Sequence, residues 1–144
     1  VKETKIDLLA LAVGNIHGIV MGIGSDGKMQ SINPKLDIER IAAIKKALRQ
    51  GLRLSSAERP QGKLIPLVLH GGSGISDEDF TAAINAGISI IHINTEIRLA
   101  WKNALEKSLS ENKDEVAPYK ILKPSFEAIK SVVKSRLQLF NKLI

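Results

Sequence analysis

The chain has three histidines, and each lies where an apolar stretch gives way to a turn. His17 lies just past the first stretch, His70 comes at the end of the second, and His92 lies in the last part of the third. Imidazole is a good zinc ligand, and a catalytic zinc ion usually has three protein ligands and one open position. We therefore expect histidines from neighbouring strands to supply part of a metal site. For His70 the alternative of a packed core histidine stays open.

Two turns beside these histidines have the composition of anion-binding segments. The turn after His70 contains Gly71, Gly72 and Ser73, and an acidic helix start follows it. Asn94 and Thr95 occupy the corresponding place after His92. Backbone N–H groups at helix N-termini bind anions through their free donors and the helix dipole. The two turns predict a phosphate site, although glycines at these positions could also serve only to form a tight turn.

Apolar stretches of strand length alternate with stretches of helical periodicity. The order strand, helix, strand, helix, strand, helix predicts an α/β fold with a parallel sheet. The expected strands cover residues 6–13, 64–69 and 88–93, and the expected helices cover residues 37–50, 76–87, 95–111 and 125 onward. All three histidines then fall at the C-terminal edge of the sheet, where parallel α/β folds bind ligands. A metal and a phosphate at one edge suggest a phosphorylated carbonyl substrate, with zinc as Lewis acid.

Capping residues predict where several of these helices begin and end. Asp37 is expected to cap the first helix and Gly51 to end it, while Ser76 and Asp79 resemble a capping box. Thr95 is expected to cap the third helix, which should break at residues 112–114. The last helix should bury a stripe made of Phe126, Ile129, Val133, Leu137 and Phe140. Residues 19–35 form a long connection that is interpreted either as a lid or as a disordered insertion.

The composition excludes several classes of protein. With 144 residues, 44% of them hydrophobic, the chain is expected to form about one folded domain. The absence of cysteine excludes disulfides and cysteine-rich zinc sites and is compatible with a reducing cytosol, so we expect a cytoplasmic protein. No apolar run of roughly 18 residues predicts a membrane span. The net charge of +6 is attributed to a solvated helix face, because 3% aromatic residues are too few for nucleic-acid stacking.

Three segments carry a resemblance to a known family. Residues 12–18 (AVGNIHG), 67–74 (LVLHGGSG) and 92–98 (HINTEIR) resemble the C-terminal signature segments of class II, zinc-dependent fructose-bisphosphate aldolases. Residues 33–37 and 117–120 are also similar to that family. The resemblance covers nearly the whole chain and implies a (β/α)8 TIM barrel. Residues 1–144 would then be the C-terminal part of a single barrel domain, about strands six to eight with the closing helices.

The resemblance also implies roles for individual residues. His17 and His70 would be metal ligands for Zn2+. The substrate phosphate would be bound by Gly18, Gly71, Gly72, Ser73, Asn94 and Thr95, with a monovalent cation (Na+ or K+) close by. Arg98 would reach the distal phosphate in the neighbouring subunit of a homodimer, which favours fructose over tagatose bisphosphate. His92 takes the place of an asparagine that contacts the enediolate in many members. It is therefore a catalytic candidate, a third basic group near the zinc, or a packing residue.

The resemblance finally predicts what a longer protein would do. The complete enzyme would cleave fructose 1,6-bisphosphate reversibly to dihydroxyacetone phosphate and glyceraldehyde 3-phosphate. A barrel needs roughly 250 residues, and the family's first zinc histidine and acid/base aspartate belong to a strand outside this sequence. The 144-residue chain alone is therefore predicted to be inactive and to need the missing N-terminal part of the barrel. The alternatives are a tagatose- or other ketose-bisphosphate aldolase, or a non-catalytic remnant that acts as a half-barrel interaction partner.

Overall fold

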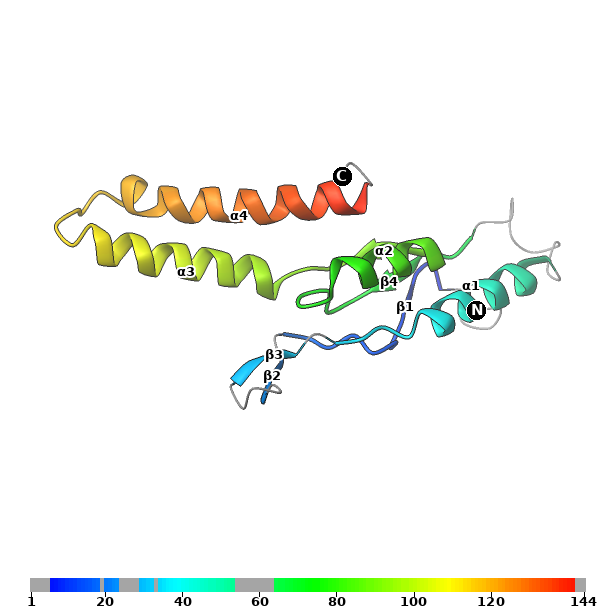
Figure 1. The fold of residues 1–144 in the computed structure, drawn as a ribbon. Helices are drawn as coiled ribbons and strands as arrows, with labels where there is room; N and C mark the ends of the chain where they lie inside the picture. The colour runs from blue at the N-terminus through cyan, green and yellow to red at the C-terminus, as the bar shows by residue number, and fades with distance from the viewer. Residues whose placement is uncertain (1–5, 19, 24–28, 33, 54–63, 142–144) are drawn as a thin grey trace. The chain divides into compact units, whose positions relative to one another are not determined.

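The chain folds into two compact units. The computed structural model describes residues 6–18, 20–23, 29–32, 34–53 and 64–141. The first unit ends at His92 and contains the strands and the two shorter helices, and the second unit begins at Ile93 and contains two long helices (Figure 1). The strand ends of the first unit and the start of the second unit are described separately below.

A parallel three-stranded sheet forms the centre of the first unit. Its strands are β1 (Leu9–Ala10), β4 (Leu67–Leu69) and β5 (Ile88–Ile91), in the order β1-β4-β5. Both pairs are parallel, as predicted, although each strand is shorter than its apolar stretch. All three residues of the central strand β4 are buried. A strand covered on both faces needs a continuous apolar run rather than an alternating one, which is what residues 64–69 provide.

Two helices accompany the sheet, α1 (Ile38–Arg53) and α2 (Asp77–Ala86). The Asp37 side chain accepts a hydrogen bond from the Arg40 N–H at 2.9 Å, which confirms the predicted cap of α1. Gly51 does not end this helix, because α1 continues to Arg53. A single glycine costs a helix only about 1 kcal/mol relative to alanine, so neighbouring residues can carry the helix through it.

The start of α2 connects the helix to the chain segment before α1. The Ser76 hydroxyl accepts a hydrogen bond from the Asp79 N–H at 3.1 Å, which is the first half of the predicted capping box. The Asp79 carboxylate instead accepts from the Leu36 N–H at 3.2 Å. Asp79 therefore links two segments that are 43 residues apart in sequence. Phe80 of α2 and Ile41 of α1 are both fully buried and form part of the core.

The described part of the long connection 19–35 forms two paired strands, which differs from a disordered insertion, and its role as a lid stays a prediction. Strands β2 (Val20–Ile23) and β3 (Met29–Ile32) pair antiparallel, with Val20 opposite Ile32 and Ile23 opposite Met29. Val20, Ile23 and Ile32 are β-branched residues, which favour strands. Residues 24–28 and Asn33 lie outside the described part of the chain.

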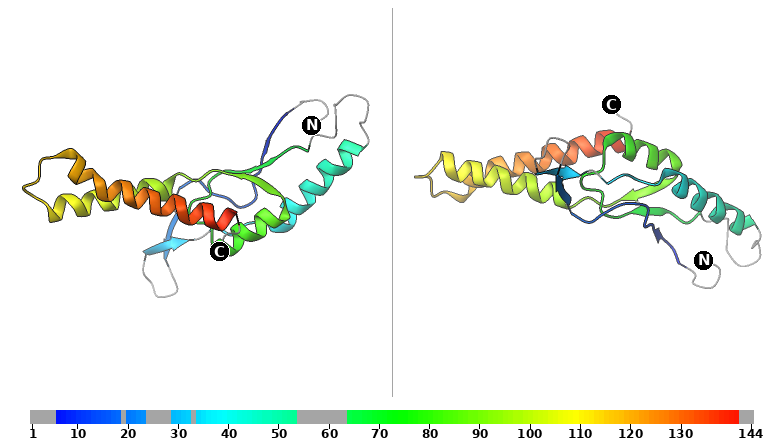
Figure 2. Two further views of the ribbon diagram at one scale, coloured as in Figure 1. Left: turned by 90° about the horizontal axis from the view of Figure 1, so that it is seen from above. Right: turned by 60° about the horizontal axis from the view of Figure 1, so that its bottom comes forward.

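The second unit is an antiparallel helical hairpin of α3 (Thr95–Glu111) and α4 (Pro118–Phe140), which lie side by side in all views (Figure 2). Thr95 is the first helical residue and not the cap, which is Asn94. Helix α3 ends at Asn112 as predicted, and the Asn112 N–H donates to the Ser108 carbonyl oxygen at 3.1 Å. No helix that the structure describes is both long enough and apolar enough to cross a membrane.

Helix α4 begins well before residue 125, where the sequence pattern predicted its start. Pro118 lies in its first turn, where the missing N–H costs nothing, and Pro124 lies inside it. The predicted stripe is partly wrong, because Phe126, Val133 and Leu137 are exposed by 64%, 37% and 55%. The adjacent small residue Ser125 is buried instead. The face of α4 that meets α3 is therefore rotated from the most apolar face.

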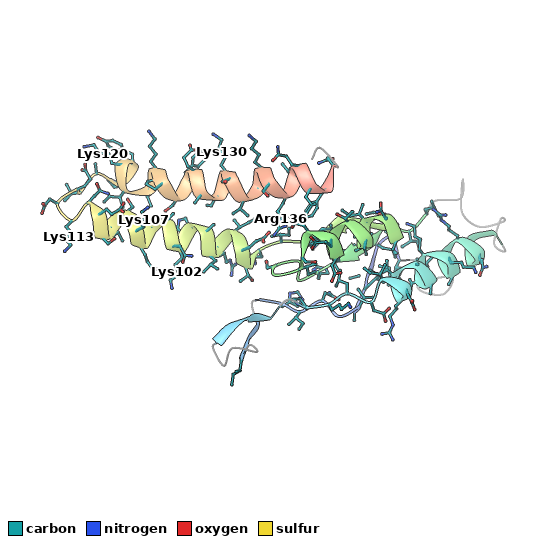
Figure 3. The ribbon with its side chains drawn as sticks, viewed as in Figure 1. Lys102, Lys107, Lys113, Lys120, Lys130 and Arg136 are labelled. Atoms are coloured by element: carbon teal, nitrogen blue, oxygen red, sulfur yellow. The ribbon has the colours of Figure 1, made fainter. Side chains whose placement is uncertain are left out.

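The connection between the two helices is organised by Glu115. Its Oε1 atom accepts from the N–H groups of Val116 and Ala117 at 3.1 and 3.0 Å, and Lys120 donates to its Oε2 at 2.7 Å. The hydrogen bond from Lys120, followed by those from the backbone, holds the pKa of the Glu115 carboxyl below its ordinary value. Figure 3 shows Lys120 and Lys130 on the outer side of α4.

One ion pair joins α3 to α4 with good geometry. Arg136 donates from Nε and from a terminal nitrogen to the two carboxylate oxygens of Glu96, each at 2.8 Å, and lies between the helices in Figure 3. The two side chains are only 21% and 18% exposed. Such a bidentate pair has little solvent screening and specifies the register of the two helices.

Breaking this pair should destabilise the helical hairpin. Glu96→Gln and Arg136→Met are each expected to lower the free energy of unfolding by about 2 kcal/mol, between the values for exposed and buried pairs. Urea unfolding followed by Trp101 fluorescence measures this change. Lys102→Ala removes the exposed Lys102–Glu106 pair, for which at most about 0.5 kcal/mol is expected. Equal losses of unfolding free energy on breaking the two pairs would contradict a special role for the Glu96–Arg136 pair.

Two buried serines in this hairpin have hydroxyls for which the described residues provide no hydrogen-bond partner. They are Ser108 on α3 and Ser125 on α4, exposed by 3% and 1%. A buried hydroxyl that makes no hydrogen bond costs about 1 to 3 kcal/mol of stability. We predict that Ser125→Ala or Ser108→Ala raises the urea midpoint, whereas Ser110→Ala, at an exposed site, leaves it nearly unchanged. A lower midpoint for both buried variants would show that the hydroxyls are satisfied.

Candidate active site at the strand ends

The turn after β1 is held to the end of β4 by Asn15. Its side-chain oxygen accepts from the Val13 N–H at 2.8 Å, and its amide nitrogen donates to the His70 carbonyl oxygen at 2.8 Å. One side chain therefore fixes the segment that leads to His17 and the backbone of His70. Sequence reasoning assigned Asn15 no role. The available signal was an asparagine directly after a glycine at a strand end, where its side chain can bond nearby backbone.

Gly71 allows the turn after His70 to pack on the turn that carries His17. Its φ angle is +65°, and a Cβ atom built on it would lie 2.5 Å from the Ile16 carbonyl oxygen. Both the backbone conformation and the lack of space therefore require glycine at this position. The same close approach brings His17 and His70 to one edge of the sheet.

His92 is fixed to the same edge by two backbone hydrogen bonds. Its N–H donates to the Leu69 carbonyl oxygen at 2.9 Å, and its own carbonyl oxygen accepts from the Gly72 N–H at 3.1 Å. These bonds extend the pairing of β4 with β5 beyond the strands themselves. The Gly72 N–H is engaged by this contact, and the role of Gly72 in phosphate binding stays a prediction. Ser73, the next residue, is 2% exposed.

The three imidazole rings form a cluster. The ring centroids of His17 and His70 are 6.1 Å apart, with an angle of 45° between the ring planes. His70 and His92 are closer, with centroids 4.4 Å apart, nearly perpendicular rings and a separation of 3.1 Å between their Nδ1 atoms. His70 is half-buried, whereas His17 and His92 are exposed. The predicted convergence of the histidines on one edge is therefore observed for all three.

The cluster can be compared with what a zinc ion requires. A zinc–nitrogen bond of about 2.0–2.1 Å places the ring centre about 3.2 Å from the ion, so two imidazoles at the tetrahedral angle have centres about 5.2 Å apart. The separation of His17 and His70, 6.1 Å, is longer than this value, and that of His70 and His92, 4.4 Å, is shorter. Within the described ranges, no group of three or more His, Cys, Asp or Glu side chains is placed to hold a metal ion. The imidazoles have the chemistry of zinc ligands, but binding an ion would require side-chain movement and further ligands.

The remaining predicted site residues lie at the start of α3, in the second unit. Asn94 precedes the helix, its side chain makes no capping hydrogen bond, and its carbonyl oxygen accepts from the Arg98 N–H at 3.1 Å. Thr95 begins the helix and Arg98 is exposed on its first turn. The start of α3 therefore presents an amide, a hydroxyl and a guanidinium close together in sequence.

Comparison with known proteins identifies the family. Residues 1–143 match the family model described as Fructose-bisphosphate aldolase class-II. The chain belongs to this family. It is 35% identical over 148 residues to a fructose-bisphosphate aldolase of Thermus caldophilus. It is also 35% identical over 141 residues to a 6-phospho-5-dehydro-2-deoxy-D-gluconate aldolase of Bacillus subtilis strain 168.

The chain spans less than half the length of these two relatives. The alignments cover 99% of the chain and 46% of the Thermus protein, and 98% of the chain and 40% of the Bacillus protein. The crystal structure of the YdjI aldolase from Escherichia coli K12 matches with a TM-score of 0.62 and 27% identity, over 96% of this chain and 40% of that one. A structure of fructose-bisphosphate aldolase from Campylobacter jejuni matches in fold with a TM-score of 0.65 and 20% identity, over 93% and 39%. The chain has the α/β fold of part of a TIM barrel.

Proposed function

We propose that the complete protein is a zinc-dependent class II aldolase that cleaves fructose 1,6-bisphosphate reversibly to dihydroxyacetone phosphate and glyceraldehyde 3-phosphate. Family membership and a similar fructose-bisphosphate aldolase support the reaction class. The observation that carries the proposal is the 6.1 Å separation of the His17 and His70 rings at the strand edge. Two imidazoles brought there by β1 and β4 suit one shared ion.

The residues of this chain would bind and orient the substrate. His17 and His70 would hold the zinc, which when bound supplies a Lewis acid for the substrate carbonyl oxygen. The backbone at Gly18, Gly71 and Ser73 would position the adjacent phosphate, together with Asn94 and Thr95. Phosphate contacts of this kind fix the reacting carbon against the catalytic groups, and a Na+ or K+ ion would help to balance the charge. The catalytic role of His92 stays a prediction.

A second substrate is favoured by a particular relative. The Bacillus subtilis protein, 35% identical, is named for 6-phospho-5-dehydro-2-deoxy-D-gluconate. Its name describes a ketone beside a phosphate, as in fructose 1,6-bisphosphate, but with a carboxylate instead of a phosphate at the far end. Tagatose bisphosphate differs from the fructose compound only in the configuration of one carbon. Recognition of the far end therefore separates the gluconate derivative from the two bisphosphates, and Arg98 is the residue we assign to it. It does not separate fructose from tagatose bisphosphate, which have the same phosphate at that end.

The complete protein and the 144-residue chain should be assayed side by side with all three substrates. We expect zinc-dependent cleavage by the complete protein and no turnover by the chain alone, because a general acid/base and a further zinc ligand would come from the missing N-terminal part. Mixing the chain with that part should restore activity, and gel filtration should show a complex that assembles further as a homodimer. Turnover by the purified 144-residue chain would contradict the prediction that it is inactive alone. A soluble chain indifferent to the missing part would favour the non-catalytic alternative.

Arg98 provides the sharpest test of substrate choice. In the complete protein, Arg98→Ala is expected to raise KM for fructose 1,6-bisphosphate by about 10- to 100-fold, the value of one or two charge-assisted hydrogen bonds. Cleavage of the corresponding ketose with no second phosphate should change much less. Lys102→Ala, exposed on the same helix, is the matched control. An equal effect on both substrates would remove Arg98 from the far end of the site.

A further inference from the structure

We propose that His92 is a metal ligand in this chain and shares one divalent transition-metal ion with His70 through their two Nδ1 atoms. The inference rests on the proposed zinc dependence of the site. It gives His92 a different role from the substrate contact predicted by the resemblance. Beside the three ligands of the proposed function His92 would be a fourth nitrogen, so the carbonyl oxygen of the substrate would bind the zinc as a fifth ligand.

The distance between the two nitrogens is the first argument. Two nitrogens bound to one tetrahedral zinc ion at about 2.0–2.1 Å lie roughly 3.3 Å apart. The Nδ1 atoms of His70 and His92 are separated by 3.1 Å, with ring planes at 82°. Two lone pairs that converge on one ion require side-chain rotation from this arrangement, in which the rings meet edge to face. The separation of the two nitrogens is nevertheless close to that of two ligands on one ion.

The backbone explains why the two rings are already close together. His70 directly follows β4 and His92 directly follows β5, and the two strands pair in parallel with Leu69 opposite Ile91. The hydrogen bonds from the His92 N–H to Leu69 and from the Gly72 N–H to His92 fix both sides of this residue. Residues that follow paired positions lie next to each other at the sheet edge. Ligands fixed in this way lose little freedom when they bind an ion.

A hydrogen bond between the imidazoles is the alternative explanation. It requires one Nδ1 to carry a proton and the other to accept it. Water competes with such a bond where a ring is exposed, as His92 is, so the bond alone gives little reason for this arrangement. A metal ion uses both lone pairs at once. The proposal concerns this pair, because within the described residues no third His, Cys, Asp or Glu side chain is placed with it to hold an ion.

Cobalt binding to the 144-residue chain tests the proposal without any activity measurement. Co2+ bound by several imidazoles gives visible absorption bands, and we expect a saturable spectrum from the unaltered chain. His92→Asn keeps a polar side chain and should weaken binding at least about tenfold and change the spectrum. Lys113→Asn, at an exposed position at the end of α3, is the matched control and should behave as the unaltered chain. Circular dichroism verifies that each variant is folded.

A second measurement on the unaltered chain makes the result independent of how His92→Asn folds. Nitrogen NMR of labelled histidines during Zn2+ addition should show coordination at Nδ1 of both His70 and His92, with Nε2 still protonated. Three results would overturn the proposal: no metal binding by the unaltered chain, equal cobalt affinity in His92→Asn, or zinc coordination that leaves His92 Nδ1 unaffected. Loss of the proposed aldolase function alone would change none of these readouts, so the two failures are distinguishable.

Discussion

In the complete protein, His17→Ala is expected to lower kcat/KM for sugar-phosphate cleavage by at least about 10³-fold, the scale on which a preorganised electrostatic group acts. The geometric reason is that His17 lies at the same strand edge as His70, with ring centroids 6.1 Å apart. Alanine leaves the backbone of the turn intact and removes only the imidazole. Activity should fall together with bound zinc, and metal analysis of the purified protein measures the second quantity directly.

The control for this prediction is an exposed position in the same unit. Glu39→Gln on α1 changes one charge without touching the strand edge, so zinc content and kcat/KM should stay within about twofold. Excess zinc should restore part of the activity of His17→Ala if the remaining ligands still bind the ion. A variant that retains its zinc and loses activity would instead make His17 a group that contacts the substrate. Retention of both would remove His17 from the site.

Much of this site could be predicted because its signals are local. Each histidine stands at the end of an apolar stretch of the kind that a buried parallel strand requires. The location of the histidines at the C-terminal edge of the sheet could therefore be predicted from the order of the elements. The caps at Asp37 and Ser76 were predictable for a similar reason, since a capping side chain bonds an N–H three residues further along the chain. Local chemistry of this kind does not depend on the rest of the fold.

The features that escaped prediction depend on contacts between distant segments. The bond from Asn15 to the His70 carbonyl joins residues 55 positions apart, and no pattern within either segment indicates it. The buried face of α4 follows its packing on α3, so Ser125 is buried while the larger Phe126 is exposed. The apolar pattern predicted the start of the last helix near residue 125, whereas α4 begins at Pro118 and contains Pro124 inside it. In each case tertiary packing outweighs local preference.

Gly71→Ala is expected to have the largest effect on stability, lowering the free energy of unfolding of the first unit by about 3 kcal/mol. A non-glycine residue at positive φ costs about 1–2 kcal/mol, and overpacking costs a further 1–3 kcal/mol. The new Cβ would meet the Ile16 carbonyl oxygen at 2.5 Å and its carbon at 2.8 Å. These are backbone atoms, so no side-chain rotation can relieve the contact, and the turn with His17 must move away.

Gly18→Ala separates the contribution of the clash from that of the backbone conformation. Gly18 also has a positive φ, +89°, but a Cβ atom there meets no atom of the described residues within 4 Å. We therefore expect Gly18→Ala to cost about 1–2 kcal/mol from conformation alone. Urea unfolding gives both values, and hydrogen exchange at the Gly72 and His92 amides should accelerate in Gly71→Ala far more than in Gly18→Ala. Equal losses in the two variants would mean that the turns of His17 and His70 are not packed together, and the histidine cluster would then lose the contact that holds it at one edge.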